Sequence, residues 1–290
     1  MRWEKRAETV LGLRISYAIA GSGPPVVLVH GAAASHLTWW ENIGPLSESY
    51  TVYAPDLPAH GDSEPPHDGD IESFGDPRFL EAFMDAVGIS SAALVGNSGG
   101  GSIVAVFALE HPERVTSLTL VDSGGLGRSV SWFLRLASLP VVGELLHLHT
   151  IDSDEELVAS IFHKPRPIDP ALSAELRGVR NSWTTRMAVV KAIRAGMNVF
   201  GTKRKALLID RLQELRVPLL IVWGEKDRVL PVRHAIDAAR RLPNAIVHIM
   251  QGCGHWPHME NSSEFNEVML RFLRSPQDLK QSLGVMETIG

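Results

Sequence analysis

Cysteine is almost absent from this chain, since Cys253 is the single one among 290 residues. A disulfide within the chain is therefore excluded, which fits a reducing compartment. Long apolar runs are missing too, and none approaches the ~18 residues that a membrane-spanning helix needs. The N-terminal residues 1–6 are charged and lack the apolar stretch of a secretory signal. We expect a cytoplasmic protein with no membrane span.

Clusters of basic residues and phosphate-binding glycine motifs are also missing. Lys and Arg are scattered along the sequence and the net charge is −5, so the sequence predicts no nucleic-acid partner. It contains no G-x-x-x-x-G-K-[ST], and no G-x-G-x-x-G at the first strand-to-helix turn. We expect neither an organic cofactor nor a metal. The composition, 44% hydrophobic and 21% charged residues, is ordinary for a soluble globular enzyme. We expect a small-molecule substrate, and a monomer or homodimer.

Short apolar runs alternate with helical patterns, which is typical of a parallel sheet covered by helices on both faces. Several runs are apolar at every position, as strands buried on both faces are. The expected strands are residues 15–19, 26–29, 51–54, 92–95, 117–121, 219–223 and 246–250. The expected helices cover residues 71–87, 103–109, 233–241 and 264–273. The pattern therefore predicts an α/β fold.

One interval interrupts this alternation. Residues 124–204 show no convincing pair of strands but several amphipathic stretches, at 130–137, 155–162, 171–178 and 186–195, which are separated by prolines. We interpret 124–204 as a helical cap, and residues 1–123 and 205–290 as the core domain. Because ligands bind at the carboxyl edge of the strands in open α/β sheets, a cap there would cover the site.

A candidate nucleophile lies where a strand is followed directly by a helix. Residues 96–100, Gly-Asn-Ser-Gly-Gly, match the nucleophile elbow G-x-S-x-G around Ser98. The glycines are needed because the elbow holds its serine on a sharp, strained turn, where larger side chains would collide with the strand and the helix. The alternative for this segment alone is a tight structural turn.

The elbow predicts an acid and then a histidine, each on a loop after a later strand. Of twelve histidines, His255 follows the last expected strand in a glycine-rich loop and is the candidate base. Asp227, directly after strand 219–223, is the candidate acid, with Asp122 as the alternative. A metal site built on His255 and His258 lacks a third ligand with suitable spacing.

The turn after strand 26–29 supplies candidates for an oxyanion hole. Small residues follow His30, and the amides of Ala32 and Gly99 suit an oxyanion. We interpret His30 as a hydrogen-bond partner of the loop backbone. Candidates for lining a substrate pocket are Trp39, Asn97, Trp132, Phe162, Trp183 and Trp256, although helix-spaced aromatic residues are often ordinary core.

Five segments resemble the α/β-hydrolase superfamily in kind and order. They are 29–31 (VHG), 56–63 (DLPAHGDS), 96–100 (GNSGG), 224–227 (GEKD) and 254–256 (GHW). The resemblance implies an eight-stranded, mostly parallel sheet with one antiparallel strand and a helical cap between strands six and seven. Ser98 differs from the aspartate of epoxide hydrolases and haloalkane dehalogenases. A serine at this position is compatible with carboxylesterases and lipases, haloperoxidase-like enzymes, and meta-cleavage product hydrolases. The asparagine before the serine, Asn97, and the segment GHW at 254–256 resemble those of the last group.

We therefore expect a serine hydrolase that cleaves carboxylic esters through an acyl-enzyme on Ser98. The alternative is a carbon–carbon hydrolase of meta-cleavage (vinylogous diketone) products. Resemblance to those enzymes implies a cap arginine that binds the substrate, and Arg177, Arg180 and Arg186 are available. A third hypothesis, a non-catalytic ligand-binding member of the fold, is disfavoured because every triad residue is present.

Overall fold

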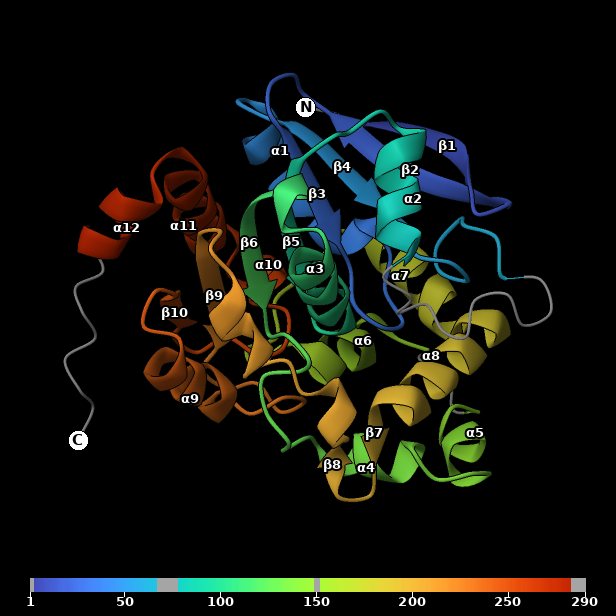
Figure 1. Ribbon diagram of the computed structural model, residues 1–290. Coiled ribbons are helices and arrows are strands. Elements are labelled where there is room, and N and C mark those ends of the chain that lie inside the picture. The colour runs from blue at the N-terminus through green and yellow to red at the C-terminus, as the bar shows by residue number, and fades with distance from the viewer. Residues whose placement is uncertain (1–2, 67–77, 149–151, 283–290) are drawn as a thin grey trace.

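The computed structural model describes residues 3–66, 78–148 and 152–282. Its centre is an eight-stranded sheet in the order β1-β2-β4-β3-β5-β6-β9-β10 (Figure 1). β2 runs antiparallel to both of its neighbours and the other pairs are parallel. The expected α/β sheet with one antiparallel strand is confirmed. Its strands are β1 (Glu4–Val10), β2 (Leu13–Ala20), β3 (Pro25–Val29), β4 (Thr51–Pro55), β5 (Ala92–Asn97), β6 (Val115–Val121), β9 (Leu219–Gly224) and β10 (Ile246–Met250).

The central strands are buried on both faces because their side chains alternate between two cores. In β3, Val27 and Val29 join one apolar cluster while Val26 and Leu28 join the other, and all four are fully buried. The first cluster lies under α2 (Arg78–Ala86), α3 (Gly99–Glu110) and α9 (Arg233–Arg241). The second lies under α1 (Trp40–Ser47), α11 (Ser262–Arg274) and α12 (Pro276–Ser282).

Three elements of the core were not expected from the sequence. β1 is a polar strand at the edge of the sheet, exposed at most positions, so it has no apolar run. α1 contains Pro45 and Gly44, which obscure its helical pattern. α12 is held by one fully buried residue, Leu279. Of the helix expected at 71–87, residues 71–77 lie outside the described residues.

Between β6 and β9, the sixth and seventh strands of the sheet by sequence, the described residues form five inserted α-helices. They are α4 (Trp132–Ala137), α5 (Val142–Leu146), α6 (Asp154–Ile161), α7 (Pro170–Asn181) and α8 (Trp183–Gly196). Four of the five begin at a Ser or Asp whose side chain accepts a hydrogen bond from the first turn. Figure 1 shows them gathered at one end of the sheet.

The expectation that residues 124–204 contain no strand pair was wrong. A short hairpin of β7 (Met197–Asn198) and β8 (Gly201–Thr202) follows α8. Its strands are two residues long, too short to give a periodic pattern. The remaining short elements are η1 (His36–Trp39), η2 (Pro112–Arg114), η3 (Arg204–Ala206), η4 (Arg211–Glu214) and α10 (Pro257–Glu260). Within the described ranges, no helix has the length and apolarity that crossing a membrane requires.

Candidate active site

Ser98 occupies the sharp turn between β5 and α3, with φ 53° and ψ −117°. This is an unfavourable conformation for a residue with a side chain, and such strain is typical of functional turns. A Cβ on Gly96 would lie 2.4 Å from the Gly100 carbonyl oxygen, and one on Gly100 would lie 2.3 Å from that of His30. The elbow therefore requires glycine at both positions. Ser98 is left partly exposed at the N-terminus of α3.

The structure brings Ser98, His255 and Asp227 into one hydrogen-bonded chain. His255 Nε2 lies 3.0 Å from Ser98 Oγ, and His255 Nδ1 lies 2.8 Å from Asp227 Oδ2. The second oxygen of Asp227 accepts hydrogen bonds from the amides of Val229 and Leu230. With its carboxylate fixed in this way, Asp227 favours the tautomer in which Nδ1 donates and Nε2 accepts the serine proton.

A second buried carboxyl group lies beside this chain. Asp122 follows β6 with φ 43°, and its Oδ1 accepts the Gly224 amide at 3.0 Å. A carboxylate oxygen of Asp122, a carboxylate oxygen of Asp227 and a ring nitrogen of His255 lie within 4.8 Å of one another. Burial, and then the charge of Asp227, raise the pKa of Asp122 well above its usual range. Burial also opposes ionisation of Asp227, but the charge and hydrogen bond of His255 outweigh it and lower its pKa.

The small-residue turn after β3 packs directly against the elbow. A Cβ on Gly31 would lie 2.9 Å from Ser98 Cβ. Among the described residues, the Ala32 amide donates no hydrogen bond, whereas the neighbouring Ala33 amide donates to His60 Nε2. Gly99 is the first residue of α3, where a backbone N–H has no partner within the helix. The amides of Ala32 and Gly99 are thus available to a ligand oxygen beside Ser98.

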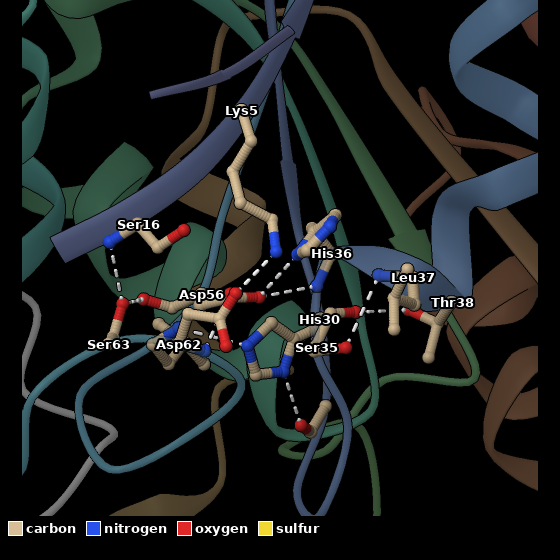
Figure 2. Close-up of polar contacts among 12 residues, drawn as sticks. Lys5, Ser16, His30, Ser35, His36, Leu37, Thr38, Asp56, Asp62 and Ser63 are labelled. Atoms are coloured by element: carbon tan, nitrogen blue, oxygen red, sulfur yellow. Dashed lines mark hydrogen bonds and ion pairs between the residues drawn. The ribbon is translucent and has the colours of Figure 1, made fainter. Parts of the chain in front are cut away.

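Asp56 holds this turn in place (Figure 2). Its Oδ1 accepts from the His36 amide at 2.7 Å and lies 2.9 Å from His36 Nδ1, while its Oδ2 accepts from the Asp62 amide. Burial alone would raise the pKa of Asp56, but the hydrogen bonds and charge of His36 lower it. The 56–63 motif therefore stabilises the turn after β3 through the hydrogen bonds of Asp56. His30 has the predicted backbone role, because its ring pairs with the Gly31 carbonyl and the Leu57 amide.

Three buried histidines make the stability of the fold depend on pH. Burial lowers the pKa of His30 to about 3, of His60 to about 4 and of His258 to about 3. In the unfolded chain they titrate near 6.5, so below this pH the unfolded state binds more protons. The raised pKa of Asp122 acts in the opposite direction. From the three histidines alone, we expect the free energy of unfolding to fall by roughly 4 kcal/mol for each pH unit by which the pH is lowered around pH 5. Their contribution to the slope should vanish above about pH 7.

Urea titrations between about pH 7 and pH 5 measure this slope. The control is His258→Phe, because both ring nitrogens of His258 are buried without a partner among the described residues, beside Trp39 and Phe265. That variant should lower the slope of the free energy of unfolding against pH by about 1.4 kcal/mol per pH unit, which corresponds to one bound proton. A free energy of unfolding that does not change with pH over this range would contradict the prediction.

The aromatic residues predicted to line a pocket are placed in three different ways. Phe162 and Trp256 are buried together in a cluster that joins α6 and α7 to the turn after β3. Trp39 is fully buried in the core under α1 and α11, where its ring packs 4.3 Å from that of His258. Trp132 and Trp183 are 70% and 56% exposed. The structure thus brings only Phe162 and Trp256 toward the His255 loop.

Asn97, the remaining predicted pocket residue, is fully buried behind Ser98. Its Nδ2 donates to the carbonyls of Val121 at 3.1 Å and His255 at 3.4 Å. Its Oδ1 is buried and has no hydrogen-bond partner among the described residues. Asn97 therefore links the elbow to residues 251–257, which we call the base loop after the candidate base His255. A cavity of about 250 Å³ lies nearby between η1 and α7–α8, but neither Asn97 nor Ser98 lines it.

The three candidate arginines have different surroundings. Arg186 donates to the carbonyls of Arg180 and His147 and to Asn181, and Arg177 donates to Ser173 on its own helix. Arg180 instead lies over the ring of Trp256, with its Cζ 5.9 Å from the ring centroid. Burial lowers the pKa of Arg180 to about 10, so it remains cationic at neutral pH. Arg180 is the one placed next to the base loop.

Glu260 connects the base loop to the inserted segment, a role that the sequence did not reveal. Its carboxylate accepts the amides of Gly254, His163 and Lys164 at 2.6 to 3.0 Å. The His255 amide also donates to the Ile161 carbonyl, in the last residue of α6. The sequence around Glu260 does not indicate this role, because His163 and Lys164 lie 97 and 96 residues away along the chain.

Comparison with known proteins agrees with this geometry. Residues 24–262 match the family described as alpha/beta hydrolase fold. The chain belongs to this family. It is 32% identical to an uncharacterized protein of Mycobacterium tuberculosis, over 97% of this chain and 84% of the relative. It is 31% identical to a 2-hydroxy-6-oxo-6-phenylhexa-2,4-dienoate hydrolase of Comamonas testosteroni, over 90% of this chain and 91% of the relative.

Among solved structures, a membrane phospholipase A described as a bacterial virulence factor superposes with a TM-score of 0.72. It is 30% identical and covers 95% of this chain and 87% of its own. The Comamonas relative and this phospholipase differ in the substrate class that their names give.

Proposed function

We propose that this protein is a serine hydrolase that cleaves carboxylic esters through an acyl-enzyme on Ser98. The observation that carries this proposal is the hydrogen-bonded chain from Ser98 through His255 to Asp227. The serine faces two available amides at the end of a strained elbow, which is the arrangement that acyl transfer needs. The similarity to a phospholipase A supports the ester as substrate class.

In this mechanism His255 Nε2 takes the proton of Ser98 as Oγ attacks the ester carbonyl. The negative charge that develops on the carbonyl oxygen is stabilised by the amides of Ala32 and Gly99 and by the N-terminus of α3. Asp227 stabilises the imidazolium, which then gives its proton to the departing alcohol. His255 next deprotonates a water that attacks the acyl-enzyme, and the acid is released with Ser98 restored.

Carbon–carbon hydrolysis is the second candidate, and Arg180 is the observation that favours it. A partly buried cation next to the base loop suits a substrate with a carboxylate, as the dienoate substrate of the Comamonas relative has by its name. A simple ester has no such group. In both candidates the cap is residues 124–204, whose α7 contributes Arg180.

Ester cleavage and carbon–carbon cleavage can be distinguished by assaying one preparation on p-nitrophenyl butyrate and on 2-hydroxy-6-oxo-6-phenylhexa-2,4-dienoate. The ester proposal expects the larger kcat/KM on the butyrate. It also expects Arg180→Gln to leave butyrate turnover nearly unchanged, as should the matched variant Arg177→Gln from the same helix. A larger kcat/KM on the dienoate, lowered by Arg180→Gln and not by Arg177→Gln, would replace ester cleavage with carbon–carbon cleavage.

A further inference from the structure

Large apolar side chains are exposed mainly on one part of this protein. Nine of the eleven in the described residues lie between residues 132 and 200. Single exposed apolar residues are ordinary, but a group of them marks an interaction site. Eight of these nine belong to α4, α5, the turns that flank α5, and the tip of the β7–β8 hairpin. We call six of the eight the apolar face: Trp132, Phe133, Val141, Leu145, Leu148 and Phe200.

These residues lie on elements that contact one another. α4 packs against α5, α8 and β7, and the Thr202 amide of β8 donates to the Arg128 carbonyl just before α4. The rings of Trp132 and Phe133 meet edge to face, and Phe133 also lies beside His147 at the end of α5. Figure 1 shows α4, α5, β7 and β8 together at the lower end of the molecule. Trp132 and Phe200, 70% and 74% exposed, are the most accessible.

The charge of the same elements is opposite in sign to that of the whole chain. Residues 128–148 and 191–206 contain seven Lys or Arg and a single acidic residue, Glu144, whereas the chain carries −5 overall. Glu144 is already paired with Arg194. Arg128, Arg204 and Lys205 are exposed, the last two directly after the hairpin. Basic residues that are scattered in sequence thus gather in the fold.

We propose that the apolar face docks on the surface of an anionic lipid bilayer. Exposed aromatic and aliphatic side chains enter the boundary between headgroups and acyl chains, while adjacent Lys and Arg are attracted by anionic headgroups. A second copy of this chain fits less well, because a symmetric contact would bring two sets of exposed basic side chains together. This docking does not depend on which bond the triad cleaves.

Cosedimentation of the full-length chain with vesicles tests the proposal. The Ser98→Ala form is used so that no lipid is consumed. We expect binding to equimolar phosphatidylcholine and phosphatidylglycerol, weaker binding to phosphatidylcholine alone, and loss of binding at high salt. Trp132→Ser combined with Phe200→Ser, and Arg204→Glu combined with Lys205→Glu, should each lower the partition coefficient at least about tenfold.

Matched controls separate the face from general effects. Leu11→Ser removes an apolar side chain that is 50% exposed in the β1–β2 turn, and Arg216→Glu with Lys280→Glu reverses two exposed charges elsewhere. Both controls should bind as the parent does. In addition, brominated lipids should quench part of the tryptophan fluorescence, and Trp132→Phe should remove that part.

Three results would overturn the proposal. One is the absence of binding to the anionic vesicles, and another is an equal loss of binding in the face variants and the controls. The third is a dimer in analytical ultracentrifugation that the Trp132→Ser, Phe200→Ser variant dissociates, without vesicle binding, which would assign the face to a second copy. Activity on p-nitrophenyl butyrate in solution is measured separately, so failure of docking and failure of the ester proposal are distinguishable.

Discussion

Replacing Ser98 with alanine is expected to lower kcat for ester hydrolysis by about 10⁴- to 10⁶-fold. Without Oγ no acyl-enzyme forms, and only the two amides and substrate binding can still accelerate attack by water. The side chain is small and partly exposed, and the side-chain hydrogen bond that its removal breaks is the one to His255. The thermal midpoint should therefore stay within a few degrees. Steady-state kinetics on p-nitrophenyl butyrate and a thermal melt measure the two effects.

Ser102→Ala is the matched control for this variant, because Ser102 lies one turn further along α3. Its activity should remain within about threefold of the parent, because Ser102 is half-buried and takes part in neither hydrogen bond that joins Ser98, His255 and Asp227. A fluorophosphonate should label the parent and Ser102→Ala but not Ser98→Ala. If Ser98→Ala kept more than about a hundredth of the parent activity, the covalent mechanism would be wrong.

The sheet and the triad geometry could be foreseen from sequence because both depend on local patterns. Strands β3, β5 and β9 are apolar at nearly every position, and a buried parallel strand leaves that signature. Motif order then placed Ser98, Asp227 and His255 on loops at one edge of the sheet. Their mutual hydrogen bonds follow from the topology more than from any one motif.

The surroundings of the triad could not be foreseen, because they depend on contacts between distant segments. Trp39 and Trp256 look alike in sequence, yet one packs in the core under α1 and the other lies beneath Arg180. Similarly, no local pattern shows that Arg128 and Lys205 lie near one hairpin. Such placement is determined by how helices α4 to α8 pack together. Sequence periodicity describes one helix at a time and therefore does not predict this packing.

Asparagine in place of Asp227 is expected to lower kcat by about 10²- to 10³-fold, less than the ~10⁴-fold typical of a triad that loses its only carboxylate. The reason is Asp122, whose side chain lies within 4.8 Å of both Asp227 and His255. Burial, and then the charge of Asp227, raise the pKa of Asp122. In Asp227→Asn that charge is gone, so the pKa of Asp122 falls and its carboxylate can stabilise the imidazolium of His255.

A double-mutant cycle makes this argument measurable. Asp122→Asn alone should cost less than about tenfold in kcat, because Asp227 is unchanged and the amide oxygen can still accept the Gly224 amide. The pair Asp122→Asn, Asp227→Asn should lose about 10⁴-fold. Asp227→Asn should also show kcat rising with pH as Asp122 ionises, and the double variant should lack this limb. Equal losses in Asp227→Asn and in the double variant would show that Asp122 supports the fold of the site without ever supplying its charge.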